Sequence, residues 1–103
     1  MGKEDIAVVK KFKKQLSKKN SINKIILFGS RVRGKAHKWS DFDIVIVSDD
    51  FKNKKSFERG IGFYEYWKED YPVDFLCYTP EEFNKLKKKV TIVREAVRNG
   101  IEI

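Results

Sequence analysis

Three short apolar runs constrain the fold of this chain more than any other feature of its sequence. They are Lys24–Phe28, Asp43–Val47 and Pro72–Tyr78. Each run is too short for a helix of ordinary length and is rich in residues that favour strands. The middle run has little polar alternation, so we expect both of its faces to be covered. The runs therefore predict three strands of a small sheet.

Helical patterns fill the segments around these strands. Apolar residues at helical spacing predict an amphipathic helix over residues 4–19 and another over about 55–69. Gly60 and Gly62 weaken the second prediction, because each glycine costs about 1 kcal/mol relative to alanine inside a helix. A short helix is also predicted over residues 30–34, directly after the first strand.

The clearest helix start follows the third strand. Thr79 can cap the helix, Pro80 suits its first position, and Glu82 completes a capping box. Apolar residues then recur at helical spacing as far as Val97, and Gly100 can end the helix. We therefore predict one long helix in this part of the chain.

The order of elements predicts an α/β (α+β) fold, in which helices pack on a small mixed sheet. The length fits a single domain over residues 1–103, and 41% of the residues are hydrophobic, which is typical of a globular protein. No signal peptide or membrane-spanning run is recognised. A single cysteine, Cys77, cannot form an internal disulfide, so we expect a reducing, cytoplasmic setting.

The formal net charge of +8 has two interpretations. It could give affinity for an anionic partner such as a nucleotide or nucleic acid. Alternatively, the lysines could simply solvate the surface. We favour the second interpretation for most of them, because charge runs usually cover a solvent-exposed face. The runs are Lys10–Lys19, Lys52–Lys55 and Lys85–Lys89.

Two carboxylates mark the start of the middle strand. Asp41 and Asp43 are two residues apart, so in an extended chain their side chains point to the same face. Like charges this close repel one another, and a divalent cation relieves that repulsion. Carboxylate oxygens combined with phosphate and water suit Mg²⁺, so the pair predicts a magnesium site.

A glycine and a serine follow the first strand and form a candidate phosphate site. Gly29 lets the backbone bend and lets a phosphate approach closely, and Ser30 offers a hydroxyl donor. A helix that starts here would also point free N–H groups at an anion. Arg31 and Arg33 could add positive charge for a triphosphate.

A third carboxylate, Asp74, lies within the last apolar run, where an unpaired charge would be costly. One interpretation places Asp74 in the same metal site, where it could also accept a proton from an incoming hydroxyl. The other is an edge-strand aspartate that faces water or a lysine. Spacing alone leaves both interpretations open.

The pattern from Gly29 to Asp43, which is Gly-Ser, ten residues and then Asp-x-Asp, resembles the signature of the DNA polymerase β-like nucleotidyltransferase superfamily. It is similar in particular to the minimal nucleotidyltransferases (MNT proteins), the partners of HEPN-domain proteins in prokaryotic toxin–antitoxin pairs. The resemblance covers most of the chain and extends to Asp74 and to residues 96–101. It implies a nucleotidyltransferase fold.

This resemblance also implies roles for individual residues. Asp41 and Asp43 would ligate two Mg²⁺ ions, and Asp74 would bind one metal and serve as the base. Gly29 and Ser30 would hold the triphosphate. The family implies ATP as the donor, adenylylation of a tyrosine on a HEPN toxin as the reaction, and a hetero-oligomeric complex with that toxin as the working form.

Two other functions compete with this interpretation. The chain could neutralise a toxic partner by covering it, although occlusion alone needs no metal-binding carboxylates. It could also bind nucleic acid through its charge and an aromatic cluster. We consider nucleic acid unlikely as a partner, because aromatic residues at helical spacing are more often part of a core or a protein interface. The cluster is Phe63, Tyr64, Tyr66 and Trp67.

Overall fold

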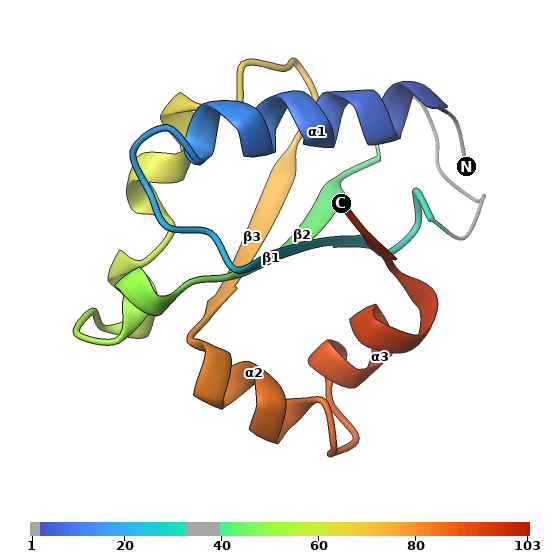
Figure 1. Cartoon of the computed structure of the whole chain (residues 1–103). Helices are drawn as coiled ribbons and strands as arrows, with labels where there is room; N and C mark the ends of the chain where they lie inside the picture. The colour runs from blue at the N-terminus through green and yellow to red at the C-terminus, as the bar shows by residue number, and fades with distance from the viewer. Residues whose placement is uncertain (1–2, 33–39) are drawn as a thin grey trace.

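The computed structural model describes residues 3–32 and 40–103, which form a four-stranded sheet with helices on both of its faces (Figure 1). The strand order is β3-β2-β1-β4. The strands are β1 (Lys24–Phe28), β2 (Phe42–Val47), β3 (Val73–Tyr78) and β4 (Ile101–Glu102). Because β1 pairs antiparallel with β2 and β4, while β2 pairs parallel with β3, the sheet is mixed. The predicted fold class is confirmed.

Helices cover the two faces of the sheet unequally. A single long helix, α1, lies on one face, and two short helices, α2 and α3, lie on the other (Figure 1). The helices are α1 (Lys3–Leu16), α2 (Pro80–Leu86) and α3 (Ile92–Asn99); the 3-10 turns between β2 and β3 are η1 (Asp49–Phe51), η2 (Ser56–Glu58) and η3 (Ile61–Glu65). No helix in the described part of the chain is long and apolar enough to cross a bilayer.

The sheet separates two hydrophobic cores, and alternate residues of β2 enter opposite ones. Ile44 and Ile46 pack in the core under α1, whereas Val45 and Val47 pack in the core under α2 and α3. All four side chains are almost completely buried. The prediction that both faces of this strand are covered is therefore confirmed.

The helix predicted over residues 55–69 is wrong. The segment instead forms the 3-10 turns η2 and η3. Gly60 lies between these turns and against β3, where an added Cβ would come within 3.3 Å of the Cys77 sulfur. The close approach of the turn to the strand, together with the low helix propensity of glycine, explains why no continuous helix forms.

The single helix predicted after Thr79 is also wrong, because it divides into α2 and α3. Thr91 starts α3: its hydroxyl oxygen accepts a hydrogen bond from the Arg94 amide and donates one to the Leu86 carbonyl, at 3.3 and 2.8 Å. The break leaves Val90 exposed to solvent. It lets both short helices pack on the same face of the sheet, so tertiary packing overrides the helical pattern.

Two further differences concern the ends of predicted elements. Residues 30–32 form a turn, in which the Val32 amide donates to the Gly29 carbonyl at 3.1 Å, and the rest of the helix predicted over 30–34 lies outside the described residues. Strand β4 was not predicted. It follows Gly100, whose amide donates to the Ala96 carbonyl as the predicted C-terminal cap of α3.

The predicted capping box at the start of α2 is confirmed. The Thr79 hydroxyl oxygen accepts from the Glu82 amide at 3.2 Å, and the Thr79 amide donates to the Glu82 carboxylate at 2.8 Å. We expect Thr79→Ala to lower the free energy of unfolding by about 1 kcal/mol, because one amide of the first turn loses its acceptor. Urea unfolding measures this change. Thr79→Ser keeps the acceptor, so an equal loss in that variant would contradict the capping role.

Candidate active site

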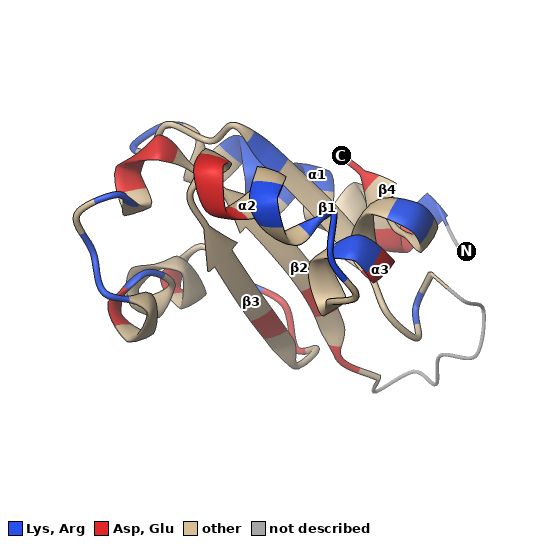
Figure 2. Ribbon diagram, turned by 90° about the horizontal axis from the view of Figure 1, so that it is seen from below, with Lys and Arg blue, Asp and Glu red and all other residues tan. Residues whose placement is uncertain are grey.

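The ends of three strands bring two predicted carboxylates together. Asp43 of β2 is the register partner of Asp74 in β3 and of Phe28 in β1. Register partners on parallel strands lie about 4.8 Å apart and point their side chains to the same face. The acidic positions of β2 and β3, which are red in Figure 2, accordingly lie near the same end of the sheet.

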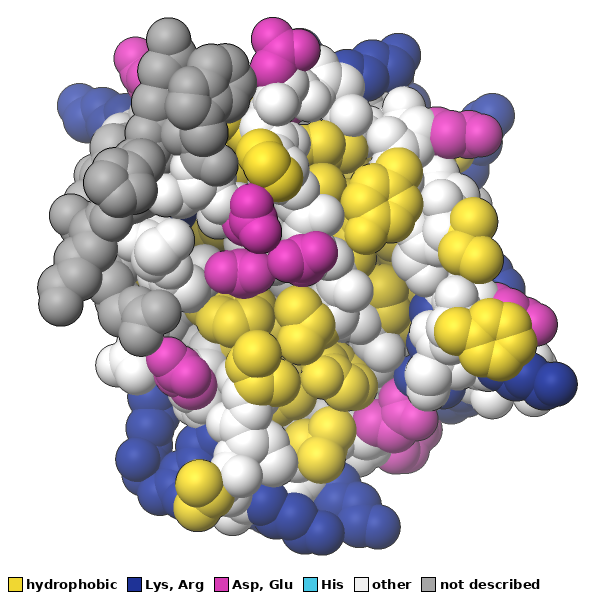
Figure 3. Space-filling model, turned by 180° about the vertical axis from the view of Figure 1, so that it is seen from behind, with side chains coloured by type: hydrophobic (Ala, Val, Ile, Leu, Met, Phe, Trp, Pro, Cys, Tyr) yellow, Lys and Arg dark blue, Asp and Glu magenta, His cyan; other side chains and the backbone are white. Residues whose placement is uncertain are grey.

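These carboxylates project from the face that α2 and α3 partly cover. Val45, two residues after Asp43, packs in the core under those helices, so Asp43 points to the same side. Asp41 and Asp74 are exposed and Asp43 is half-buried, which shows that the helices leave this end of the face open. Acidic side chains gather near the centre of the molecular face shown in Figure 3.

The structure bears on both interpretations of Asp74. The residue does lie on a strand at the edge of the described sheet, and it is exposed. It forms no ion pair with any described lysine or arginine, so no cation in this part of the chain balances its charge. Its register with Asp43 fits a shared site, its exposure fits an aspartate that faces water, and the lysine pairing is not seen among the described residues.

Gly29 brings the backbone directly onto the Asp43 carboxylate. Its φ of +87° lies in the left-handed region, which is costly for residues with a Cβ atom. A Cβ atom at this position would also clash with Oδ2 of Asp43. Glycine is thus required for the close approach of the turn to the carboxylate, and it places the half-buried Ser30 beside the same site.

Arg31, predicted to contact a triphosphate, is buried and occupied by other contacts. Its Nε donates to the Ser40 carbonyl at 3.0 Å, and its Nη1 pairs with Asp5 of α1 at 3.1 Å. The guanidinium also lies 4.1 Å from the centre of the Phe42 ring. These contacts fasten the turn after β1 to the start of α1 and to the entrance of β2, and a nucleotide contact for Arg31 stays a prediction.

No local pattern links Arg31 to Asp5, because the two residues are 26 positions apart. Only the packing of α1 over the sheet brings them together. Arg33, the other arginine predicted to bind the triphosphate, lies outside the described residues.

The carboxylates fit magnesium in the manner typical of nucleotide enzymes. Among the described residues, no three His, Cys, Asp or Glu side chains lie close enough together to hold a metal ion by themselves. A closed site of Asp41, Asp43 and Asp74 therefore stays a prediction. Mg²⁺ is, however, usually held by one or two carboxylates together with phosphate oxygens of a substrate. The in-register pair of Asp43 and Asp74 offers that donor set.

A cysteine on the same strand as Asp74 takes no part in this chemistry. Burial raises the pKa of the Cys77 thiol to about 12. The thiol is therefore protonated at neutral pH, and a protonated thiol is a poor nucleophile. This leaves Asp74 as the candidate reactive group of β3.

Comparisons with known proteins agree with this geometry. The family model described as "Nucleotidyltransferase domain" matches residues 9–99. The chain is 32% identical over 106 residues to "Probable protein adenylyltransferase MntA" of Haemophilus influenzae, with 96% of this chain and 86% of that protein covered.

Solved structures share the fold. A crystal structure of a candidate nucleotidyltransferase from Sulfolobus solfataricus superposes with a TM-score of 0.61 at 20% identity, covering 99% of this chain and 87% of that one. A toxin–antitoxin crystal structure with AMP-PNP gives a TM-score of 0.56 at 22% identity, covering 93% and 69%. Because the family match spans most of the sequence, this chain belongs to the nucleotidyltransferase domain family and is a nucleotidyltransferase.

Proposed function

We propose that this enzyme transfers AMP from ATP to a tyrosine hydroxyl of a HEPN-domain toxin, and that it acts in this way as the antitoxin. The observation that carries the proposal is the in-register pair of Asp43 and Asp74 beside the Gly29 turn. The similarity to the Haemophilus influenzae adenylyltransferase supports AMP as the transferred group. The fold shared with a toxin–antitoxin structure supports a toxin as the partner.

Each part of the site has a task in this reaction. Gly29 and Ser30 hold the triphosphate, because the turn has no side chain at its closest point to the carboxylates. Asp43 and Asp74 would hold magnesium together with phosphate oxygens of ATP, and Asp41 would add a third carboxylate when the nucleotide is bound. When bound, magnesium lowers the pKa of the attacking hydroxyl and neutralises charge on the leaving pyrophosphate. The protein then contributes mainly by positioning the reacting groups.

Asp74 accepts the proton in the transfer step. The acceptor hydroxyl oxygen attacks the α-phosphorus of ATP, and the bond from that phosphorus to the bridging oxygen of the β-phosphate breaks. AMP is thereby joined to the acceptor and pyrophosphate leaves. The hydroxyl proton passes to the Asp74 carboxylate, which is exposed and so accessible to an acceptor from outside the molecule.

The test is transfer of label from ATP carrying ³²P in its α-phosphate to the cognate HEPN protein, with and without Mg²⁺. We expect the partner to gain the mass of AMP on a tyrosine in the presence of Mg²⁺, and replacement of that tyrosine by phenylalanine to prevent labelling. A partner that is bound and neutralised without gaining AMP would contradict the proposal and would indicate occlusion instead.

A further inference from the structure

Two adjoining hollows on α2 and α3 form one surface, which we call the α3 groove. The first lies between the two helices and strands β1 and β4, and both apolar and charged side chains line it. The second lies over the outer side of α3. Both hollows are lined in part by Lys87 and Val97, so they are continuous. The groove comprises Phe83 and Val97 with Lys87, Lys88, Arg94 and Arg98.

Four cations of the α3 groove have no partner of opposite charge among the described residues. None of them forms an ion pair within residues 3–32 and 40–103, whereas Lys24 at the far rim pairs with Glu102 at 3.6 Å. Clustered like charges repel one another, and an acidic ligand relieves that repulsion. The four are Lys87, Lys88, Arg94 and Arg98.

The apolar part of the groove indicates what kind of acidic ligand fits. Phe83 lies at its base, with the ammonium groups of Lys24 and Lys87 at 5.3 and 5.9 Å from the ring centre. Phe83 itself is only 4% exposed, whereas Val97 is 46% exposed and lines both hollows. The accessible apolar contact is therefore aliphatic, and an aliphatic side chain does not stack on a base as an aromatic one does, so the groove suits a protein segment better than a nucleic acid.

The α3 groove lies on the same side of the sheet as the candidate active site. Phe83 packs in the core that contains Val45 of β2, and Asp43 precedes Val45 by two residues on the same face. Lys and Arg side chains follow the lower edge of the face whose centre carries the acidic cluster (Figure 3). A protein held in the groove would therefore lie on the same face of the sheet as the carboxylates, although Lys24 of the groove and the Asp43 partner Phe28 are at opposite ends of β1.

We propose that the α3 groove docks an acidic amphipathic segment of a partner protein. An apolar side chain of that segment packs on the exposed Val97, and its acidic side chains pair with the lysines and arginines. This mode corresponds to an amphipathic helix laid in a groove. Identifying the segment with part of the acceptor toxin rests on the proposed function, whereas the groove and its ligand chemistry do not.

The test uses a labelled peptide of about 14 residues, with leucine on one helical face and glutamate on the other. We expect saturable binding by fluorescence anisotropy, and about tenfold weaker binding when Lys88→Glu and Arg98→Glu are combined, because two charge pairs become repulsive. A peptide with serine in place of leucine should also bind at least several-fold more weakly, because it lacks the apolar anchor.

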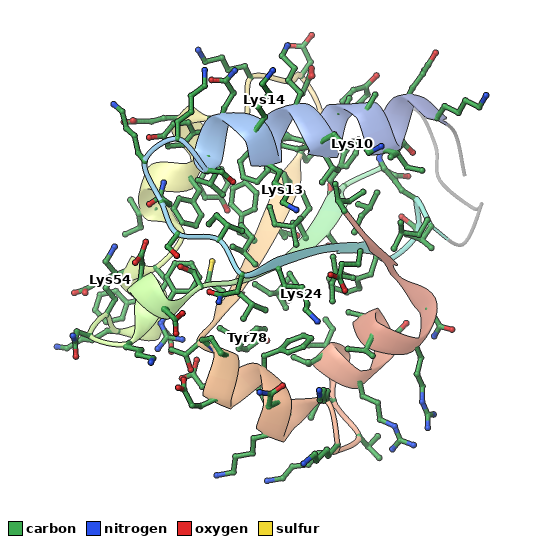
Figure 4. All side chains as sticks on the ribbon, viewed as in Figure 1. Lys10, Lys13, Lys14, Lys24, Lys54 and Tyr78 are labelled. Atoms are coloured by element: carbon green, nitrogen blue, oxygen red, sulfur yellow. The ribbon has the colours of Figure 1, made fainter. Side chains whose placement is uncertain are left out.

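The control variant combines Lys10→Glu with Lys14→Glu, which changes the charge equally. Both lysines lie on α1, on the opposite side of the sheet from α2 and α3 (Figure 4). Thermal melting checks that both double variants are folded. Equal weakening by the control, no saturable binding, or tighter binding of a single-stranded oligonucleotide at the groove would overturn the proposal. Asp43→Asn should bind the peptide normally, so failure of docking and failure of transfer are distinguishable.

Discussion

Asp43→Asn is expected to lower the rate of AMP transfer by about 10²–10³-fold while leaving the fold intact. Asp43 links the two parts of the candidate site, because it is in register with Asp74 and also lies against the Gly29 turn. The amide keeps the shape of the side chain but removes the negative charge that we propose binds magnesium and so positions the triphosphate. Losses of this size are typical when one electrostatic contact to the reacting group is removed.

The measurement is the initial rate of label transfer from ATP, with urea unfolding as the check on stability. Asp70→Asn is the matched control, because Asp70 is exposed and lies in the loop before β3. We expect that control to transfer AMP at the normal rate. Full activity in Asp43→Asn would show that the paired aspartates are not the catalytic centre.

Gly29→Ala is expected to lower both stability and activity. The alanine would have to adopt a φ of +87°, and its Cβ would clash with Oδ2 of Asp43. The positive φ alone costs about 1–2 kcal/mol, and the clash adds to it, so we expect a total loss of about 2–4 kcal/mol. Transfer should fall by about 10²-fold even under conditions where the variant is folded, because the turn or the carboxylate must move.

Gly62→Ala separates these causes from a general effect of replacing glycine. A Cβ atom at Gly62 would meet nothing within 4 Å, and the residue has no positive φ. Its unfolding free energy should change by less than about 0.5 kcal/mol, and its transfer rate should stay normal. If Gly29→Ala behaved like this control in both assays, the close approach of the turn to Asp43 would have no functional role.

Local patterns were sufficient for the strands and for one helix start. Each of the three apolar runs forms a strand within one residue of its predicted bounds, because a short β-branched run has few other ways to bury itself. The capping box at Thr79 depends on residues three positions apart, so it too could be recognised from the chain. The pairing of two candidate carboxylates required one further piece of information, namely that β3 lies parallel to β2 and in register with it.

Predictions failed where packing between distant segments decided the structure. The apolar spacing over residues 55–69 is helical, yet the segment packs as 3-10 turns against β3. The break at Val90 and the pairing of β4 with β1 both involve contacts with strands far away in the sequence. The contact of Arg31 with Asp5 of α1 also depends on packing between distant segments and was not predicted.

The sequence by itself determined the strands, the family signature and the candidate residues for magnesium and phosphate, since these depend on residue type and short spacing. Tertiary structure alone decided which of them meet. Asp43 and Asp74 share a site because parallel register aligns two strands separated by a long connection. Arg31 forms an ion pair with Asp5 because α1 packs over the sheet and brings Asp5 next to it. Contacts of this kind join residues far apart in the chain, and no local pattern encodes them.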